Sequence, residues 1–222
     1  MQSAAQILEA SALASIRTLV DGRQEHAVQF IRRLIAIESP SGDVDGSRAV
    51  NQLLEDALRA IPSVSQSERM PSAGCGEHLL VHAFTGAKTN EQTILLLGHT
   101  DTVHPHGTLG TPNGMRLDGD RLYGPGSFDM KASCVMAVEA LHALTALSLQ
   151  PRRPVTLLLT CDEEIGSPTG RALVEREARR AAQVLVLEPP APGGCVKTAR
   201  KGVGGWTVSA HGIASHAGLH PE

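Results

Sequence analysis

Three short aliphatic runs stand out in the pattern of hydrophobic and polar positions: residues 93–98, 155–160 and 184–187. Short apolar runs bounded by turn-forming residues are typical of buried parallel strands. Between the runs, Met130–Leu149 and the more polar Thr169–Arg180 are predicted to be helices. The order strand, long loop, helix, strand, helix, strand predicts a three-layer α/β domain with helices on both faces of a sheet.

The remaining segments fit this scheme. Apolar positions recur at helical spacing through the first sixty residues, with an interruption at Ser39–Asp43. Residues 79–84 predict a further strand. Residues 99–127 are rich in Gly, Pro, Asn and Asp, and a loop of this length in a compact domain is more often functional than idle. From about residue 200 the pattern changes, and residues 202–210 alternate as a strand does.

Composition excludes several classes of function. The chain of 222 residues has 20 Lys and Arg against 23 Asp and Glu, and only three Phe, one Trp and one Tyr. Nucleic-acid binding is therefore not expected, because both a basic surface and aromatic stacking platforms are missing. No apolar stretch approaches the ~20 residues needed to cross a bilayer, and the N-terminal sequence does not resemble a secretory signal. We expect a cytoplasmic protein that does not act on membranes.

The four cysteines are far apart and form no Cys-x-x-Cys pair. This spacing argues against a structural zinc knuckle and does not support a disulfide framework. Cys161 lies next to an acidic cluster, but without an evident histidine partner it is predicted to be a small buried residue.

Each of the three aliphatic runs is followed by side chains that can bind metal ions. His99 and Asp101 follow the first run, Glu163 and Glu164 follow the second, and Glu188 follows the third. In open α/β sheets the carboxyl ends of the strands line the ligand crevice. The pattern therefore predicts a metal site at one edge of the sheet, and a hydrolytic site is the first hypothesis.

His99 and Asp101 are separated by one residue, so both can point to the same side of a strand end. An imidazole that binds a metal usually donates its other N–H to a carboxylate or carbonyl. We therefore expect His99 to be a ligand and Asp101 to orient it. Because the motif is short, an ordinary hydrogen-bonded pair is an equal alternative.

The acidic triplet Asp162–Glu164 is the strongest of these signals. Three adjacent carboxylates after an apolar strand repel one another and are costly near a core without cations. Consecutive strand residues face opposite sides, so Glu163 and Glu164 converge only if the strand breaks, as Gly166 and Pro168 suggest. One carboxylate can then bind metal while its neighbour accepts a proton. The alternative is a solvated acidic turn.

Other positions allow two interpretations. Asp129 follows a glycine-rich segment at the start of the long helix, where it either caps the helix or bridges two metal ions. His104 and His106 are predicted to be loop histidines rather than ligands. His216 lies among small residues beyond the α/β domain, where a turn histidine is the simpler interpretation.

Five motifs resemble, in the same order, those of the zinc-dependent aminoacylase/carboxypeptidase metallopeptidase family. The motifs are Gly98–Val103, Gly124–Lys131, Asp162–Ser167, Glu188–Pro189 and Ala214–Gly218. The family includes glutamate carboxypeptidase, acetylornithine deacetylase and succinyl-diaminopimelate desuccinylase, and the chain looks most similar to the first. The resemblance implies a zinc-exopeptidase-like sheet and two zinc ions in each intact active site, with cobalt or manganese as possible substitutes.

The resemblance also implies a ligand set for these ions. His99, Asp129 and Glu188 would hold one ion, while Asp129 would bridge to the second, which Glu164 would also bind. This assignment gives Asp129 the central position.

Catalytic roles follow from the same resemblance. Asp101 would orient His99, and Glu163 would be the general base. His216 would lie in a smaller lid and dimerisation domain and reach the active site of a partner subunit. The expected full-length enzyme is a homodimer that hydrolyses a peptide or N-acyl bond next to a carboxylate-bearing amino acid, so its substrates would be small peptides or N-acyl amino acids.

One feature departs from the family pattern. The family takes a further metal-binding histidine from late in a longer chain, whereas this sequence ends at Glu222. We therefore expect a fragment, with a catalytic metal-binding α/β domain over residues 1–199 and the first strand of a truncated α+β lid over residues 200–222. The alternatives are a truncated, non-catalytic metal-binding fragment and a metal-free structural domain.

Overall fold

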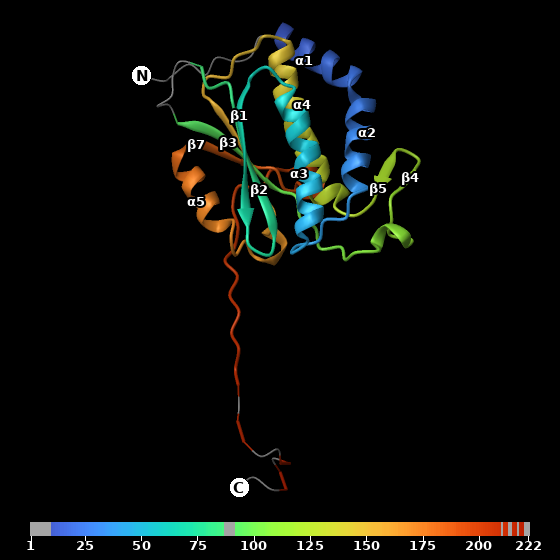
Figure 1. Cartoon of the computed structure of the whole chain (residues 1–222), viewed down its shortest axis with the longest axis vertical. Helices are drawn as coiled ribbons and strands as arrows, with labels where there is room; N and C mark the ends of the chain where they lie inside the picture. The colour runs from blue at the N-terminus through green and yellow to red at the C-terminus, as the bar shows by residue number, and fades with distance from the viewer. Residues whose placement is uncertain (1–9, 87–91, 210, 213–214, 217, 220–222) are drawn as a thin grey trace. The chain divides into compact units, whose positions relative to one another are not determined.

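The computed structural model describes residues 10–86, 92–209, 211–212, 215–216 and 218–219 (Figure 1). The chain divides into two compact units, Met1–Pro189 and Pro190–Glu222. The first unit contains every α-helix and every multi-residue strand assigned to the described residues. Among the described residues of the second unit, the helical element is a short 3-10 turn at Pro192–Gly194.

A five-stranded mixed sheet forms the centre of the first unit, with the strand order β1-β2-β6-β3-β7. The strands are β1 (Val64–Ser72), β2 (Gly76–Ala83), β3 (Thr93–His99), β6 (Val155–Thr160) and β7 (Ala181–Val186). β3 pairs in parallel with both β6 and β7, whereas β1, β2 and β6 pair antiparallel. The predicted parallel arrangement of β3, β6 and β7 is thus confirmed. Its consequence is that the carboxyl ends of these strands meet at one edge of the sheet.

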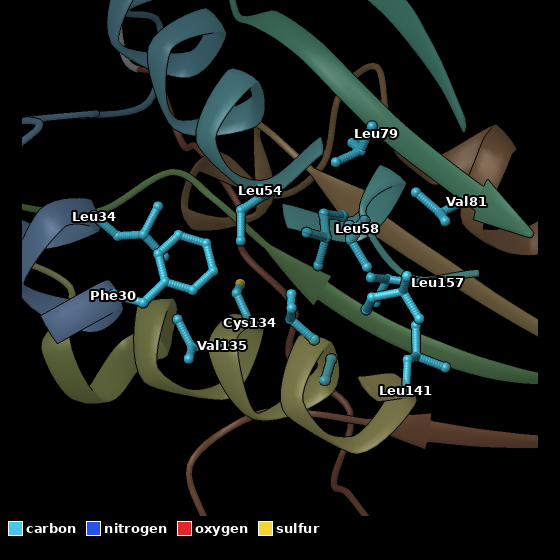
Figure 2. Packing of buried hydrophobic residues seen from close by; sticks show 14 of the residues in the cluster. Phe30, Leu34, Leu54, Leu58, Leu79, Val81, Cys134, Val135, Leu141 and Leu157 are labelled. Carbon is cyan, nitrogen blue, oxygen red and sulfur yellow. The ribbon is translucent and has the colours of Figure 1, made fainter. Parts of the chain in front are cut away.

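Helices cover both faces of the sheet, as expected for a three-layer α/β domain (Figure 1). They are α1 (Ala10–Gly22), α2 (Gln24–Ile35), α3 (Val44–Arg59), α4 (Ala132–Ala146) and α5 (Arg171–Arg180). The larger core cluster joins α2, α3 and α4 to one face, and Figure 2 shows its packing around Leu54, Cys134 and Leu157. The smaller cluster joins α5 to the other face through Leu173.

The central strand β6 shows how one segment supports both layers. Leu157 and Leu159 belong to the larger cluster, whereas Leu158 belongs to the smaller one. This alternation follows from the two-residue period of a strand. Because both faces are covered, every residue of β6 is buried, which explains why four of its six residues are aliphatic.

Two features were not predicted. β1 is a polar edge strand that contains Pro71, and most of its residues are exposed or half-buried. Edge strands tolerate both polar residues and proline, so β1 carries a weak strand signal. The long loop after β3 also contains a small hairpin, β4 (Arg116–Asp118) and β5 (Arg121–Tyr123).

One expectation was wrong. The third aliphatic run was expected to be a buried strand, but β7 lies at the edge of the sheet, and Val184, Leu185 and Val186 are 39%, 52% and 57% exposed. Central and edge strands can both be aliphatic, so an aliphatic run alone does not predict how deeply a strand is buried.

The proposed division of the chain at residue 199 stays a prediction. The two compact units meet at residues 189 and 190, and residues 202–209 are not assigned to a strand. Residue 210, the last of the predicted strand, lies outside the described residues. None of the helices in the described part of the chain combines the length and apolarity that a membrane crossing requires.

Candidate metal centre

The centre is built on His99, the last residue of β3, which is 1% exposed. Buried side chains contact both the backbone N–H and the backbone carbonyl of His99. The His99 N–H donates to Met130 Sδ at 3.3 Å, and the Cys134 thiol donates to the His99 carbonyl at 3.4 Å. The strand pairing continues past His99, because the Thr100 N–H donates to the Thr160 carbonyl at 2.8 Å. His99 therefore leaves the sheet in one defined position.

The two nitrogens of His99 have different surroundings. Nδ1 lies 3.0 Å from the Asp101 carbonyl oxygen and 3.4 Å from Asp101 Oδ1. Nε2 lies 3.1 Å from Asp129 Oδ1 and 3.5 Å from Glu188 Oε1. Burial lowers the pKa of His99, but the hydrogen bond to Asp101 and the charges of Asp101, Glu188 and Glu163 outweigh it and raise the pKa to about 9. The Nε2 position thus faces a concentration of negative charge.

Asp129 reaches this position from an irregular turn, Ser127–Lys131, which precedes α4. Its backbone is extended, with φ −118° and ψ 95°, and its side chain is half-exposed. The N-cap position of α4 is Lys131, and no side chain makes a capping hydrogen bond there. Asp129 is therefore not a helix cap, and its carboxylate faces His99. Gly126 allows the approach, because a Cβ at this residue would lie 2.5 Å from the Thr102 side chain.

Glu163 and Glu164 lie in a single 3-10 turn, Glu163–Ile165, after β6. The backbone N–H of Glu163 donates to Asp101 Oδ1 at 3.2 Å, and that of Glu164 donates to Asp101 Oδ2 at 3.1 Å. The predicted break in the strand is therefore present, although β6 already ends at Thr160, before Gly166. Within a turn, the two adjacent side chains are no longer forced to opposite sides.

The ligand atoms form two overlapping groups. One contains His99, Asp129 and Glu164, and the other contains His99, Glu163 and Glu188, with all ligand atoms within 4.8 Å of one another in each group. These sequence-predicted residues come from the ends of β3, β6 and β7 and from the start of α4.

The charge balance of this cluster fits a divalent cation. Partial burial raises the pKa of Glu164 and of Glu188, the positive His99 opposes this, and the neighbouring carboxylates Asp129 and Glu163 raise both pKa values further. Four carboxylates around one imidazole leave excess negative charge in a partly buried place, which is costly unless a cation compensates it. Imidazole and carboxylate are also the donors that zinc, cobalt and manganese accept.

Asp101 links the parts of the centre through four contacts. Besides His99 and the two glutamate N–H groups, it accepts a hydrogen bond from Ser41 Oγ at 2.6 Å. Burial raises the pKa of Asp101, but the hydrogen bonds from His99 and Ser41 more than compensate and lower it. Sequence reasoning missed Ser41, although it lies in the Ser39–Asp43 break that interrupts the helical pattern.

The acidic triplet does not act as one unit. Asp162 is fully buried, and its Oδ2 accepts hydrogen bonds from the Thr169 and Gly170 N–H groups at 2.6 and 2.9 Å and from the Thr169 hydroxyl at 2.7 Å. Asp162 therefore lies outside both ligand groups: loop donors bind its Oδ2, whereas its Oδ1 is buried without a hydrogen-bond partner among the described residues.

The remaining candidates lie outside the two ligand groups. His106 lies 3.2 Å from Asp43 and 3.5 Å from Glu38, and neither it nor His104 belongs to a candidate group among the described residues. Cys161 does have a histidine neighbour, contrary to expectation, because its Sγ lies 3.6 Å from Nδ1 of His78. It is buried, however, and burial raises the pKa of its thiol to about 12, which suits a packing role.

His216 lies in the second unit, where its Nδ1 accepts a hydrogen bond from the Gly218 N–H at 3.2 Å. Its catalytic role stays a prediction. Ala214 and Ala217 of the same motif lie outside the described residues.

Comparison with known proteins places this geometry in a family context. A sequence model described as peptidase family M20/M25/M40 matches residues 95–211, more than half of the chain. The chain is 30% identical over 200 residues to carboxypeptidase G2 of a Pseudomonas species, which covers 90% of this chain and 47% of that protein. It is 38% identical over 146 residues to succinyl-diaminopimelate desuccinylase of Verminephrobacter eiseniae, covering 60% of this chain and 36% of the relative. The chain thus spans less than half of either relative.

Solved structures support the fold. Human carnosine dipeptidase 1 superposes with a TM-score of 0.63 at 20% identity, over 80% of this chain and 41% of that one. The di-peptidase Dug1p of Saccharomyces cerevisiae superposes with a TM-score of 0.64 at 16% identity, over 78% and 40% of the two chains. At these identities, the likeness establishes the fold.

Proposed function

Because this chain belongs to peptidase family M20/M25/M40, we propose that it carries the metal-binding part of a hydrolase that cleaves peptide or N-acyl bonds next to a carboxylate-bearing amino acid. The observation that supports this most is the convergence on His99 Nε2, where Asp129 and Glu188 lie within 3.5 Å and belong to different segments. The relatives' names, carboxypeptidase and desuccinylase, support a small peptide or an N-acyl amino acid as the substrate.

We assign the ligands as follows. His99, Asp129 and Glu188 would hold one ion, and Asp129 and Glu164 would hold a second. Zinc suits this mixture of imidazole and carboxylate donors, and cobalt and manganese are accepted by the same donor types. Bound ions of this kind lower the pKa of a water towards ~7 and polarise an amide carbonyl.

Glu163 is the residue we assign to proton transfer. It is exposed, whereas Glu164 beside it is half-buried, and its backbone N–H is held by Asp101 at 3.2 Å. A general base must come within hydrogen-bond reach of the proton that it abstracts. Glu163 would take the proton of the attacking water and pass it to the leaving amine. Asp101 would keep the Nδ1 side of His99 engaged, so that Nε2 stays available as a ligand.

Metal binding tests the site without depending on turnover. The chain is stripped with chelator and titrated with Co²⁺ or Zn²⁺ by calorimetry, beside the variants His99→Ala and Glu163→Gln. His106→Ala is the matched control, because His106 is an exposed histidine outside both ligand groups. We expect His99→Ala to lose tight binding while His106→Ala and Glu163→Gln keep it. Equal affinity of wild type and His99→Ala would refute the site.

Hydrolysis is tested separately with a panel of dipeptides and N-acyl amino acids, followed by release of free amine. If the chain turns over any of them, Glu163→Gln should abolish the activity with metal content unchanged. Loss of metal together with activity would contradict the role of Glu163 as the base. Metal binding by wild type without turnover of any substrate would assign the metal site, but not catalysis, to this chain.

A further inference from the structure

The buried carboxylate of Asp162 has no part in the chemistry assigned above, yet it is one residue from Glu163. It lies two residues after the end of β6 and is fully buried. Its Oδ2 accepts three hydrogen bonds of 2.6–2.9 Å, all from Thr169 and Gly170. Its backbone carbonyl also accepts a hydrogen bond from the Ser167 N–H at 2.8 Å. Asp162 therefore ties both ends of one loop together.

The loop between these contacts is the one that presents the glutamates. It runs from the 3-10 turn at Glu163–Ile165 through Gly166 and Ser167, which have φ values of +89° and +56°. A positive φ is unfavourable for a residue such as Ser, so the loop conformation needs outside contacts to hold it. The hydrogen bonds to Asp162 supply them at the far end of the loop.

A second buried carboxylate holds the near end. Asp101 accepts the N–H groups of Glu163 and Glu164, while Asp162 accepts those of Thr169 and Gly170. The turn is thus held between two buried carboxylates, and only Asp101 also contacts His99. Hydrogen bonds from N–H groups to a carboxylate are shorter and about twice as strong as neutral ones.

The surroundings of Asp162 leave it little freedom. A Cβ at Gly170 would lie 2.7 Å from Asp162 Oδ1 and 3.0 Å from the Thr160 side chain. The Thr169 hydroxyl that donates to Asp162 also lies 3.1 Å from Nε2 of His78, which is 4% exposed. Close packing and a shared hydroxyl restrict the carboxylate to one orientation.

We propose that Asp162 is a positioning residue, whose buried carboxylate fixes the loop so that Glu164 reaches the metal and Glu163 the attacking water. This inference rests on the proposed metal site. The new element is that the metal affinity of this site depends partly on a residue that touches neither the metal nor the substrate. Partners behind a metal ligand typically change metal affinity by about 10–100-fold when they are removed.

The test measures Co²⁺ affinity and the visible absorption spectrum of the Co²⁺-loaded chain at a temperature where each variant is folded. Asp162→Ala removes the acceptor for all loop donors, so we expect its Kd to rise by about 10-fold or more and its spectrum to change. Asp162→Asn keeps one oxygen facing the loop, so its Kd should stay within about 3-fold of wild type, although its amide group lowers stability.

Asn51→Ala is the matched control for a purely structural effect. Asn51 is also fully buried, and its side chain donates to the Glu77 carbonyl at 2.6 Å, away from the ligand groups. We expect Asn51→Ala to lower the melting temperature without changing the Kd. If Asp162→Ala likewise lowers only the melting temperature, with Kd and spectrum unchanged, the inference is overturned.

If Asp162→Ala does not fold, Thr169→Val takes its place, because it removes one of the three donors to Asp162 and should raise the Kd about fivefold. An unchanged Kd in Thr169→Val then overturns the inference. If wild type itself binds no Co²⁺, the metal site fails and this inference fails with it, a result distinct from wild type and Asp162→Ala binding equally well.

Discussion

Replacement of Asp101 by asparagine tests how the centre is held together in the absence of metal. The side chain is 3% exposed and receives four contacts. Oδ2 accepts from Ser41 Oγ at 2.6 Å and the Glu164 N–H at 3.1 Å. Oδ1 accepts from the Glu163 N–H at 3.2 Å and lies 3.4 Å from His99 Nδ1. Asparagine has the same shape but only one acceptor oxygen.

The expected loss of folding stability in Asp101→Asn follows from the number of hydrogen-bond donors that lose their acceptor. If the asparagine oxygen takes the Oδ2 position, the Glu163 N–H faces an NH₂ group. If it takes the Oδ1 position, the Ser41 hydroxyl can rotate to accept, but the Glu164 N–H is then unpaired. Either orientation leaves one partly buried N–H unsatisfied, which costs about 1–3 kcal/mol. The remaining hydrogen bonds also lose their charge assistance, so we expect a total loss of about 2–4 kcal/mol.

The assay is urea denaturation of the metal-free chain at pH 7, supported by thermal melting. For a chain of this size, the expected loss corresponds to a fall in melting temperature of about 5–15 °C. Asp120→Asn is the matched control, because Asp120 is exposed at the hairpin turn and should change stability by less than about 0.5 kcal/mol. If Asp101→Asn and Asp120→Asn are equally stable, Asp101 does not hold the centre together in the way described.

Three further predictions concern stability and ligand binding. Burial raises the pKa of Glu55, but the hydrogen bonds from Ser67 and Arg69 have the larger combined effect, so the net shift of the pKa is downward. A lowered pKa stabilises the folded state above the ordinary value of 4.5 and this contribution is lost as the pH falls. Glu55→Gln should therefore melt below wild type at pH 7, and the gap should close in melts near pH 3; a gap independent of pH would contradict this. Gly98→Ala places a Cβ 2.7 Å from Met130 Cε, so denaturation should show a loss of about 1–3 kcal/mol. The second substitution Met130→Ala should cost less in that background than in wild type, and strict additivity would argue against the clash. Zinc at 100 times its Kd should stabilise wild type by about 2.7 kcal/mol in thermal melts, and an equal gain in His99→Ala would contradict the site.

The fold was largely predictable from local patterns, for reasons visible in single strands. β6 is buried on both faces, so four of its six residues are aliphatic and the strand signal is strong. β1 is an edge strand with few buried residues, and its polar sequence did not predict a strand. β7 shows the opposite error, since its aliphatic sequence predicted burial that its edge position does not provide.

The candidate site was predictable in its members but not in its internal arrangement. His99, Glu163, Glu164 and Glu188 were identified because each follows an aliphatic run, and parallel pairing brings the ends of those runs together. Their roles as ligands and base stay proposals. Ser41 could not be found in this way, since it lies 60 residues from Asp101 in the sequence.

Neighbouring residues alone show which side chains leave the sheet at its carboxyl edge, because strand periodicity is a local pattern. The division of the acidic triplet, with Glu163 and Glu164 turned towards His99 and Asp162 turned into the core, becomes visible in the folded chain. Hydrogen bonds between distant segments select the conformation of this turn. Asp101 reaches Glu163 and Glu164 only because β3 and β6 pair in one register, and that register is a property of the folded sheet.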